Sequence, residues 1–438
     1  MTDHALALTP LDDPPDAPAD EMRRREHAWR STHRADALWP GLDEAVIQAA
    51  ADTIGAAVAG VLRDERATLE FATTGAEGER RARALGVAAL LTGVGPLLGA
   101  WTADGTLASE PPIARVLARH LAHARAREAR IRATVMPLLA RMERDGLTPG
   151  VIKGFHTAQV YFPEPGARPF SDVDVVVPPA AIPRAERLLG EAGFAAEPRV
   201  GTTTYKREWL PPDDNARDVW SYELWHARSH WKLDLHDGLN FSEVLQHVRI
   251  PQVPRFDDVL TVDGVTLRVA DANELIALLA AHASTELYSH RLLRLVELVL
   301  VVRRATALRT LDWRAVESAL AVRGWLRFAY PTLALTERLA PGTIDAALLD
   351  SSSAATTARA RTVTSALSPT APILGASFSL RERLIWASGV GATMRWLWRM
   401  VTPLEGASRS RQWRTYRHRA ARLLSMLGGR PRSGGDTR

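Results

Sequence analysis

Residues 168–177 have the sequence RPFSDVDVVV, and this stretch decides the fold that we expect. Successive side chains of a β-strand point to opposite faces, so Asp172 and Asp174 share one face while Val173 and Val175 share the other. Two carboxylates held close together are costly unless a divalent cation or a proton neutralises them, and oxygen ligands of this kind suit Mg²⁺ or Mn²⁺. The stretch therefore predicts a core strand that carries a cation site.

A second predicted strand carries a third carboxylate. Residues 231–236, WKLDLH, alternate between apolar and polar side chains, which is typical of a half-buried strand. The polar face of this strand carries Lys232, Asp234 and His236. If the two strands are neighbours, Asp234 can converge with Asp172 and Asp174, and three such carboxylates can hold two Mg²⁺ ions about 3.5–4 Å apart. This arrangement is typical of nucleotidyl transfer, in which Asp234 would take the acceptor proton or hold the ion that acidifies the acceptor.

The surrounding pattern predicts an α+β fold, with a mixed β-sheet and its flanking helices between two helical regions. Alanine, leucine and arginine recur at helical spacing before residue 147, short β-branched runs follow, and helical spacing returns after residue 270. We expect a disordered leader (1–40), an N-terminal helical region (41–147), a core (148–269), a helical domain (270–345), and a linker with a basic helical C-terminal region (346–438).

Composition excludes several classes of protein. The 438 residues are 46% apolar and 24% charged, which indicates a soluble globular protein with room for two or three domains. With no cysteine, the chain has no disulfides, no zinc-thiolate sites and no cysteine nucleophile, and it fits a reducing cytoplasm, where we expect it. Residues 84–103 are uncharged, but their glycines and proline favour buried helix pieces over a membrane span.

Lysine is rare in this chain. The three lysines are Lys153, Lys206 and Lys232, against fifty-two arginines, and the formal net charge is +5. The bias reflects genomic composition, but it makes each remaining lysine worth attention, since all three lie in the segment around Asp172. Chance clustering of three residues is the alternative explanation.

The order of motifs resembles the uncharacterised nucleotidyltransferase family of the polymerase-β-like superfamily. The motifs that carry the resemblance are Val151-Ile152-Lys153-Gly154, residues 168–177, Leu188-Leu189 with Gly193-Phe194, Leu233-Asp234-Leu235-His236, and, more weakly, His282, His290-Arg291, Arg294-Leu295 and Asp312-Trp313. The resemblance implies a polymerase-β-like core and a Mg²⁺-dependent enzyme that uses ATP or another NTP. It also implies that Asp172, Asp174 and Asp234 are the catalytic metal ligands.

The same resemblance suggests how a nucleotide would be bound. In the superfamily, a Gly-Ser pair that opens the helix before the acidic strand binds the triphosphate, and Gly154-Phe155 occupies the corresponding place here. We expect Lys153 and Arg168 to compensate for the missing serine, because a helix N-terminus with nearby cations attracts phosphate. The expected nucleotide-binding residues are Lys153, Gly154, Arg168 and Ser171. Lys232 and His236 are expected to orient the ligand residues without binding the cation themselves. His236 would do so by contacting Asp234.

Several functions remain open at this point. The leading hypothesis is transfer of a nucleoside monophosphate from an NTP to a hydroxyl or phosphate of a small molecule, peptide or protein, as in bacterial natural-product or modified-peptide tailoring. One alternative is a catalytically degenerate binding or scaffold protein of the same fold, suggested by Phe155, and a weaker one is a glycosyltransferase with an Asp-x-Asp motif. The arginine-rich tail, residues 405–438, could bind nucleic acid, although a solvated helix face is favoured. No membrane span is expected, and the oligomeric state is left open.

Overall fold

The computed structural model describes residues 17–70, 75–197, 206–212, 219, 221–238, 254–284, 287, 291–370, 385–386, 391 and 394. The first sixteen residues of the predicted leader, the arginine-rich tail and His290 lie outside the described residues.

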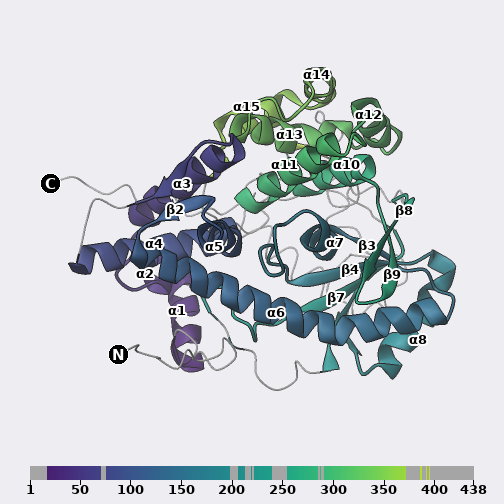
Figure 1. The fold of residues 1–438 in the computed structure, drawn as a ribbon, viewed down its shortest axis with the longest axis horizontal. Helices are drawn as coiled ribbons and strands as arrows, with labels where there is room; N and C mark the ends of the chain where they lie inside the picture. The colour runs from purple at the N-terminus through teal and green to yellow at the C-terminus, as the bar shows by residue number, and fades with distance from the viewer. Residues whose placement is uncertain are drawn as a thin grey trace.

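Among the described residues, a mixed sheet of seven strands has the order β5-β6-β7-β4-β3-β9-β8, and it lies between α6 and the C-terminal helices (Figure 1). The strands are β3 (Gly150–Ile152), β4 (Asp172–Val176), β5 (Ala195–Ala196), β6 (Lys206–Leu210), β7 (Lys232–His236), β8 (Asp258–Val262) and β9 (Val265–Val269). Strand β4 pairs in parallel with β7 and antiparallel with β3. The expected α+β class is confirmed, and the two acidic strands are neighbours.

The two faces of the sheet meet different helices. Val173, Val175 and Leu235 join a core cluster with α6 (Pro111–Arg144) and α8 (Ile182–Glu191), which follows the short 3₁₀ helix η1 (Pro179–Ala181). Ile152 and Val176 join a different cluster with helices of the C-terminal half. Helix α7 (Lys153–Val160) packs against β3 and β4. The acidic side chains of β4 therefore point away from α6, toward the side of the C-terminal helices.

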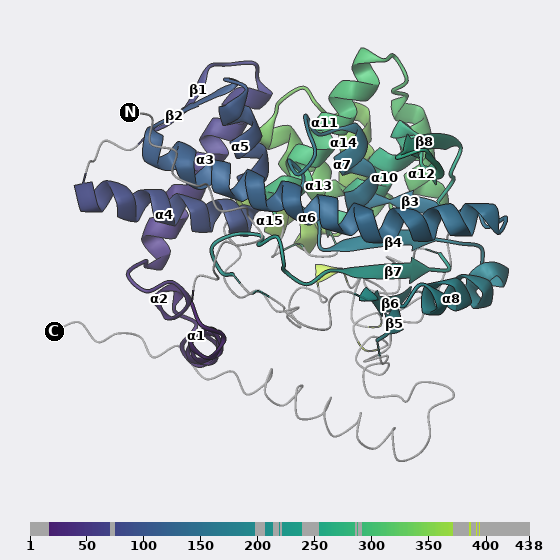
Figure 2. The same ribbon diagram turned by 60° about the horizontal axis from the view of Figure 1, so that its bottom comes forward.

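The N-terminal region is a second, helical core. It contains α3 (Glu44–Leu62), α4 (Gly75–Thr92), α5 (Gly95–Ala103) and a two-stranded parallel sheet of β1 (Ala67–Leu69) and β2 (Leu107–Ser109). Helix α6 connects this region to the sheet, as Figure 2 shows. Its Leu117 and Leu121 lie in the N-terminal core, whereas Val135 and Leu139 lie in the core under the sheet.

The prediction of a disordered leader is wrong for residues after 18. Ala19–Thr32 forms α1 and Ala35–Leu38 forms α2. Trp39 is buried, and its indole Nε1 donates a hydrogen bond to the carbonyl oxygen of Tyr222, 2.6 Å away. The sequence pattern missed these helices because a contact with a residue 183 positions later leaves no local signal.

The C-terminal helical domain extends beyond the predicted boundary at residue 345. It contains α10 (Ala272–Ala283), α11 (Leu292–Ala307), α12 (Trp313–Val322) and α13 (Leu326–Leu339), and continues with α14 (Ala346–Ala355) and α15 (Ala358–Ala366). The sequence predicted a linker with a basic helical region from residue 346, with the small and polar residues 356–370 as the linker. Both helices pack on α13, and each has an N-cap side chain, Asp345 for α14 and Thr357 for α15.

Helix α3 is long and apolar enough to cross a membrane, with a mean hydropathy of 1.6, and half of its most apolar window is buried. Helices α4 and α5 pass the same test only together, and they meet at 117°. All three contribute to the N-terminal core cluster. Residues 84–103 are thus buried helix pieces, as the sequence predicted, and the buried core helix of a globular protein passes the same test as α3.

Buried His120 should make the protein sensitive to mild acid. A Cβ atom at Gly95 would lie 2.5 Å from its Nδ1, so a glycine leaves room for the ring. Burial, with smaller effects from Arg119 and His123, lowers the pKa of His120 from 6.5 to about 3. Protons then bind the unfolded chain more readily, so the stability that neutral His120 contributes is present above pH 6.5 and is lost as the pH falls toward 3. Between pH 7 and pH 5 the loss should be about 2 kcal/mol.

Urea unfolding at both pH values measures this loss. In His120→Gln the decrease in unfolding free energy should be smaller by that amount, because the titrating ring is absent. Equal decreases in the two proteins would show that His120 does not titrate with unfolding.

Candidate active site

The register of β4 and β7 brings the acidic side chains together. Asp174 lies directly beside Asp234, and Asp172 lies beside Lys232. On the other side of β7, the antiparallel strand β6 places Glu208 beside Asp234. Three carboxylates on three adjacent strands, those of Asp174, Asp234 and Glu208, therefore form one row across the sheet.

Asp174 is the centre of this group. Lys153 Nζ donates a hydrogen bond to its Oδ1 at 2.8 Å, and His236 Nε2 lies 2.8 Å from the same oxygen. Burial raises the pKa of Asp174, but Lys153 and His236 outweigh burial and hold the pKa well below its usual range. Asp174 is therefore an anion in this site. His236 was expected to support Asp234, and the structure places it on Asp174 instead.

Asp234 has one occupied and one open oxygen. Its side chain is 2% exposed, and Lys206 Nζ donates to Oδ2 at 2.7 Å. Oδ1 is buried and accepts no hydrogen bond from any residue that the structure describes, with Lys232 Nζ still 3.7 Å away. A buried carboxylate oxygen without a donor is costly, so this atom is a candidate ligand for a cation.

The donor atoms around this oxygen fit a hard divalent cation. One ligand atom each from Asp174, Asp234 and His236 lies within 4.8 Å of the others. Two carboxylates suit Mg²⁺ and Mn²⁺, and imidazole is an additional ligand that Mn²⁺ accepts. The three residues therefore could hold such a cation.

Asp172 lies on the same face but outside this closest group. Its side chain is half-buried, and Ser171 Oγ lies 3.5 Å from its Oδ1. Burial, then the negative charge of Asp174, raises the pKa of Asp172, while Lys153 opposes the shift. A carboxylate whose charge is costly beside another carboxylate gains from an added cation. Asp172 is thus placed at the solvent side of the cluster, rather than converging fully as the sequence predicted.

Lys153 begins α7 with an unusual backbone. Its φ of 51° is in the left-handed region, which is uncommon for a residue other than glycine and costs of order 1 kcal/mol. Gly154 follows, and a Cβ there would lie 2.6 Å from Arg168 Nη1. Phe155 comes next and is fully buried in the core under the sheet. The start of α7 thus directs Lys153 onto Asp174, while Gly154 permits close packing.

Arg168 does not face the cluster as expected for a nucleotide-binding residue. Its guanidinium donates two hydrogen bonds to Glu297 of α11, from Nε to Oε1 and from Nη2 to Oε2, both at 3.0 Å. Nη1 donates to the carbonyl oxygen of Pro169, and the residue is 4% exposed. Thr157 Oγ1 of α7 also donates to Glu297. Arg168 therefore forms a buried ion pair that links the core to the helical domain.

Sequence reasoning missed three residues around the site. Lys206 and Glu208 lie on β6, whose aromatic and β-branched surroundings gave no motif, and Glu297 lies on a strongly apolar helix. A signal existed for Lys206, because lysine is so rare in this chain. The structure joins all three lysines to the carboxylates of the site: Lys153 to Asp174, Lys206 to Asp234 and Glu208, and Lys232 to Glu208.

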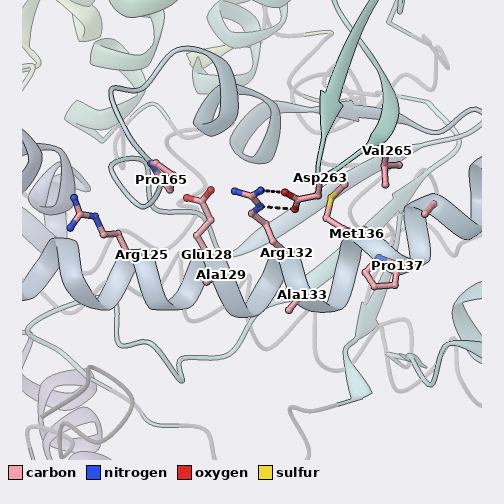
Figure 3. A pocket seen from close by; sticks show the side chains of 11 residues that line it. Arg125, Glu128, Ala129, Arg132, Ala133, Met136, Pro137, Pro165, Asp263 and Val265 are labelled. Carbon is pink, nitrogen blue, oxygen red and sulfur yellow. Dashed lines mark hydrogen bonds and ion pairs between the residues drawn. The ribbon is translucent and has the colours of Figure 1, made fainter.

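A surface pocket of about 610 Å³ lies elsewhere, along α6 and the β8–β9 turn (Figure 3). Arg132 reaches across it to Asp263, and Glu128 accepts a hydrogen bond from the backbone nitrogen of Gly166 at 2.6 Å. None of the acidic residues of the sheet face lines this pocket. Its charged groups are already paired, so we assign no chemistry to it.

Comparisons with known proteins point to one family. A family model described as "uncharacterised nucleotidyltransferase" matches residues 82–341, more than half of the chain, and is the family that the motifs resemble. No curated protein matches the chain. The solution structure of the antibiotic-resistance factor ANT(2'')-Ia matches with 13% sequence identity over 45% of this chain and 92% of that chain, at a TM-score of 0.27. That score is too low to establish a shared fold.

Proposed function

Since the chain belongs to this family of uncharacterised nucleotidyltransferases, we propose that it transfers a nucleoside monophosphate from an NTP to an acceptor. The proposed NTP is ATP, the proposed cation is Mg²⁺ or Mn²⁺, and the proposed acceptor group is a hydroxyl or a phosphate. We also propose that the sheet and α7 are a polymerase-β-like core. In support, the two acidic strands are parallel neighbours, and α7 packs against one of them.

Asp234 Oδ1 is the observation that supports the proposal most directly. It is a buried carboxylate oxygen without a hydrogen bond from the described residues, and it lies in a group whose other members are Asp174 and His236. A divalent cation bound there would neutralise charge on the phosphates during transfer. If Asp234 acts as a base instead of a cation ligand, Oδ1 is the oxygen that would accept the proton of an attacking hydroxyl, because Lys206 holds Oδ2.

Positive charge surrounds the place where a triphosphate would lie. Lys153 stands at the first turn of α7, where the helix N-terminus also favours anions. Arg294 of α11 is about one quarter exposed, and its charge lowers the pKa of Asp172. These two cations would attract and orient the phosphates of an NTP, and Arg294 is a site residue that we add to the set expected from the sequence.

Transfer can be tested without knowing the acceptor in advance. Incubation of the protein with Mg²⁺ and ATP labelled at either the α- or the γ-phosphate, together with a candidate acceptor, should move only the α-label onto the acceptor. Excess EDTA should remove the transfer, because Asp174 and Asp234 then lack their cation. Transfer of the γ-label instead would indicate a kinase and contradict the proposal.

A catalytically degenerate binding protein is the second candidate. Phe155 favours it, since a buried phenylalanine cannot supply the hydroxyl that the superfamily uses on the triphosphate. Calorimetry with ATP separates the two candidates. An enzyme should bind ATP with a dependence on Mg²⁺, whereas a scaffold that has lost its nucleotide site should show no Mg²⁺-dependent binding.

A further inference from the structure

The lysines of this chain form one network with the carboxylates of the sheet. The chain has three lysines and fifty-two arginines, yet every lysine or arginine that forms a described ion pair with Asp174, Asp234 or Glu208 is a lysine. Arginines elsewhere hold most of the described ion pairs, including the buried pair between Arg168 and Glu297. The residue type at the site is thus the exception in this protein.

Lys206 lies between two carboxylates. Its Nζ is 2.7 Å from Asp234 Oδ2 and 2.7 Å from Glu208 Oε1, and its side chain is about one quarter exposed. Lys232 Nζ lies 2.5 Å from Glu208 Oε1 and 3.7 Å from Asp234 Oδ1. Glu208 therefore contacts both lysines, and Lys206 could leave Asp234 without losing its second partner.

A lysine is better suited than an arginine to be a counter-ion that must leave its carboxylate when a cation binds. Its ammonium is a single compact charge on a flexible stem, whereas the planar guanidinium of arginine binds a carboxylate through two parallel hydrogen bonds. A bidentate arginine would occupy both oxygens of Asp234. A lysine occupies one oxygen and leaves the other, as Oδ1 is left here.

The charges around the site also favour exchange. Asp172, Asp174, Asp234 and Glu208 offer four carboxylates, and three lysines and Arg294 offer four cations, so an added divalent cation makes the site net positive. A divalent cation placed at Asp234 Oδ1 would repel the ammonium of Lys206 on the same carboxylate. Glu208 is the anion that can receive Lys206 at that moment.

We propose that Lys206 is an exchangeable counter-ion: without a divalent cation it pairs with both Asp234 and Glu208, and when a cation binds Asp234 it leaves Asp234 and stays on Glu208. Lys206 and Glu208 are therefore positioning residues of the cation site, which itself rests on the proposed function. The consequence is that the protein alone binds a divalent cation weakly, because the cation must displace Lys206.

The test is Mn²⁺ binding to the full chain, measured by the electron paramagnetic resonance signal of free Mn²⁺. Lys206→Met removes the competing charge and should tighten Mn²⁺ binding about tenfold. Lys206→Arg keeps the charge, but its guanidinium would bind both oxygens of Asp234, so Mn²⁺ binding should weaken about tenfold. A Lys206 that merely orients Asp234 predicts the reverse order, with Lys206→Met weaker and Lys206→Arg unchanged, and that result overturns the proposal.

Two further variants separate the possible failures. Arg207→Met removes one positive charge from the opposite face of the same strand, where Arg207 pairs with Glu186, and should leave Mn²⁺ affinity within about twofold. Asp234→Asn should remove the binding altogether. If Asp234→Asn binds Mn²⁺ as well as the unsubstituted protein, the cation site of the proposed function is wrong. If Asp234→Asn loses binding but the Lys206 variants show the reverse order, only the exchange is wrong.

A measurement on the unsubstituted protein avoids any failure of variants to fold. Isotope labelling of lysine gives three ε-carbon resonances, since the chain has three lysines. Saturating Mg²⁺ should shift the resonance of Lys206, which is identified as the one that is missing from the spectrum of Lys206→Arg. Unchanged positions of all three resonances would contradict the exchange.

Discussion

Replacing Asp174 with asparagine should reduce nucleotidyl transfer by about 10³-fold or more, which corresponds to about 4 kcal/mol of transition-state stabilisation. The substitution keeps the shape of the side chain and removes one negative charge. Asp174 contacts Lys153 and His236 and belongs to the group of ligand atoms that includes Asp234. In Asp174→Asn the ammonium of Lys153 faces a neutral amide in place of a carboxylate, so the site binds a divalent cation more weakly.

The measurement is the rate of transfer of the α-phosphate label at saturating Mg²⁺. Asp258→Asn is the matched control, because Asp258 is exposed on β8 at the far edge of the same sheet, and this variant should retain the full rate. Circular dichroism of both variants verifies that they fold. Undiminished transfer by folded Asp174→Asn would falsify the assignment of Asp174 to the cation site.

The buried pair of Arg168 and Glu297 should give the largest effect on stability. Both side chains are almost fully buried, at 5% and 0% exposure, and they share two hydrogen bonds. Glu297→Gln leaves the guanidinium in the core without an opposite charge, which costs about 3–5 kcal/mol in comparable pairs. Urea titration should show this loss as a lower free energy of unfolding.

A surface pair provides the control for this prediction. Glu191 pairs with Arg141 while about two fifths of each side chain is exposed, so Glu191→Gln should cost about 1 kcal/mol or less. The double variant Arg168→Met with Glu297→Met removes both charges and should be more stable than Glu297→Gln alone. A double variant as unstable as Glu297→Gln would mean that packing, and not the unpaired charge, causes the loss.

The central residues of the site could be predicted from local patterns in the sequence. The alternation in residues 172–176 and 232–236 predicted both strands, and it predicted which face carries Asp174, Asp234 and His236. Alternation is a property of neighbouring residues, so it can be recognised without knowing what lies across the sheet. The family resemblance was confirmed by the match over residues 82–341.

Contacts between distant residues were beyond the reach of the same reasoning. Arg168 was expected at the nucleotide because it flanks the acidic strand, but Glu297, 129 residues later, takes its guanidinium. Lys206 belongs to a strand without a recognisable motif, and only its pairing with β7 places it on Asp234. Residues 19–38 were predicted as part of a disordered leader, and the contact that buries the adjacent Trp39 is with Tyr222, far along the chain. In each case the deciding partner is on another element.

The contacts of Glu297 with Arg168 and Thr157 have a consequence for folding during synthesis. Synthesis proceeds from the N-terminus, so Arg168 and Thr157 emerge from the ribosome long before Glu297 does. Until α11 has been translated, the guanidinium of Arg168 has no buried anion to receive it, and the start of α7 lacks its anchor. The sheet that carries the acidic row is therefore not expected to mature as an independent nascent domain. A fragment ending at residue 269 should remain loosely packed, and only chains long enough to include α11 should complete the proposed cation site.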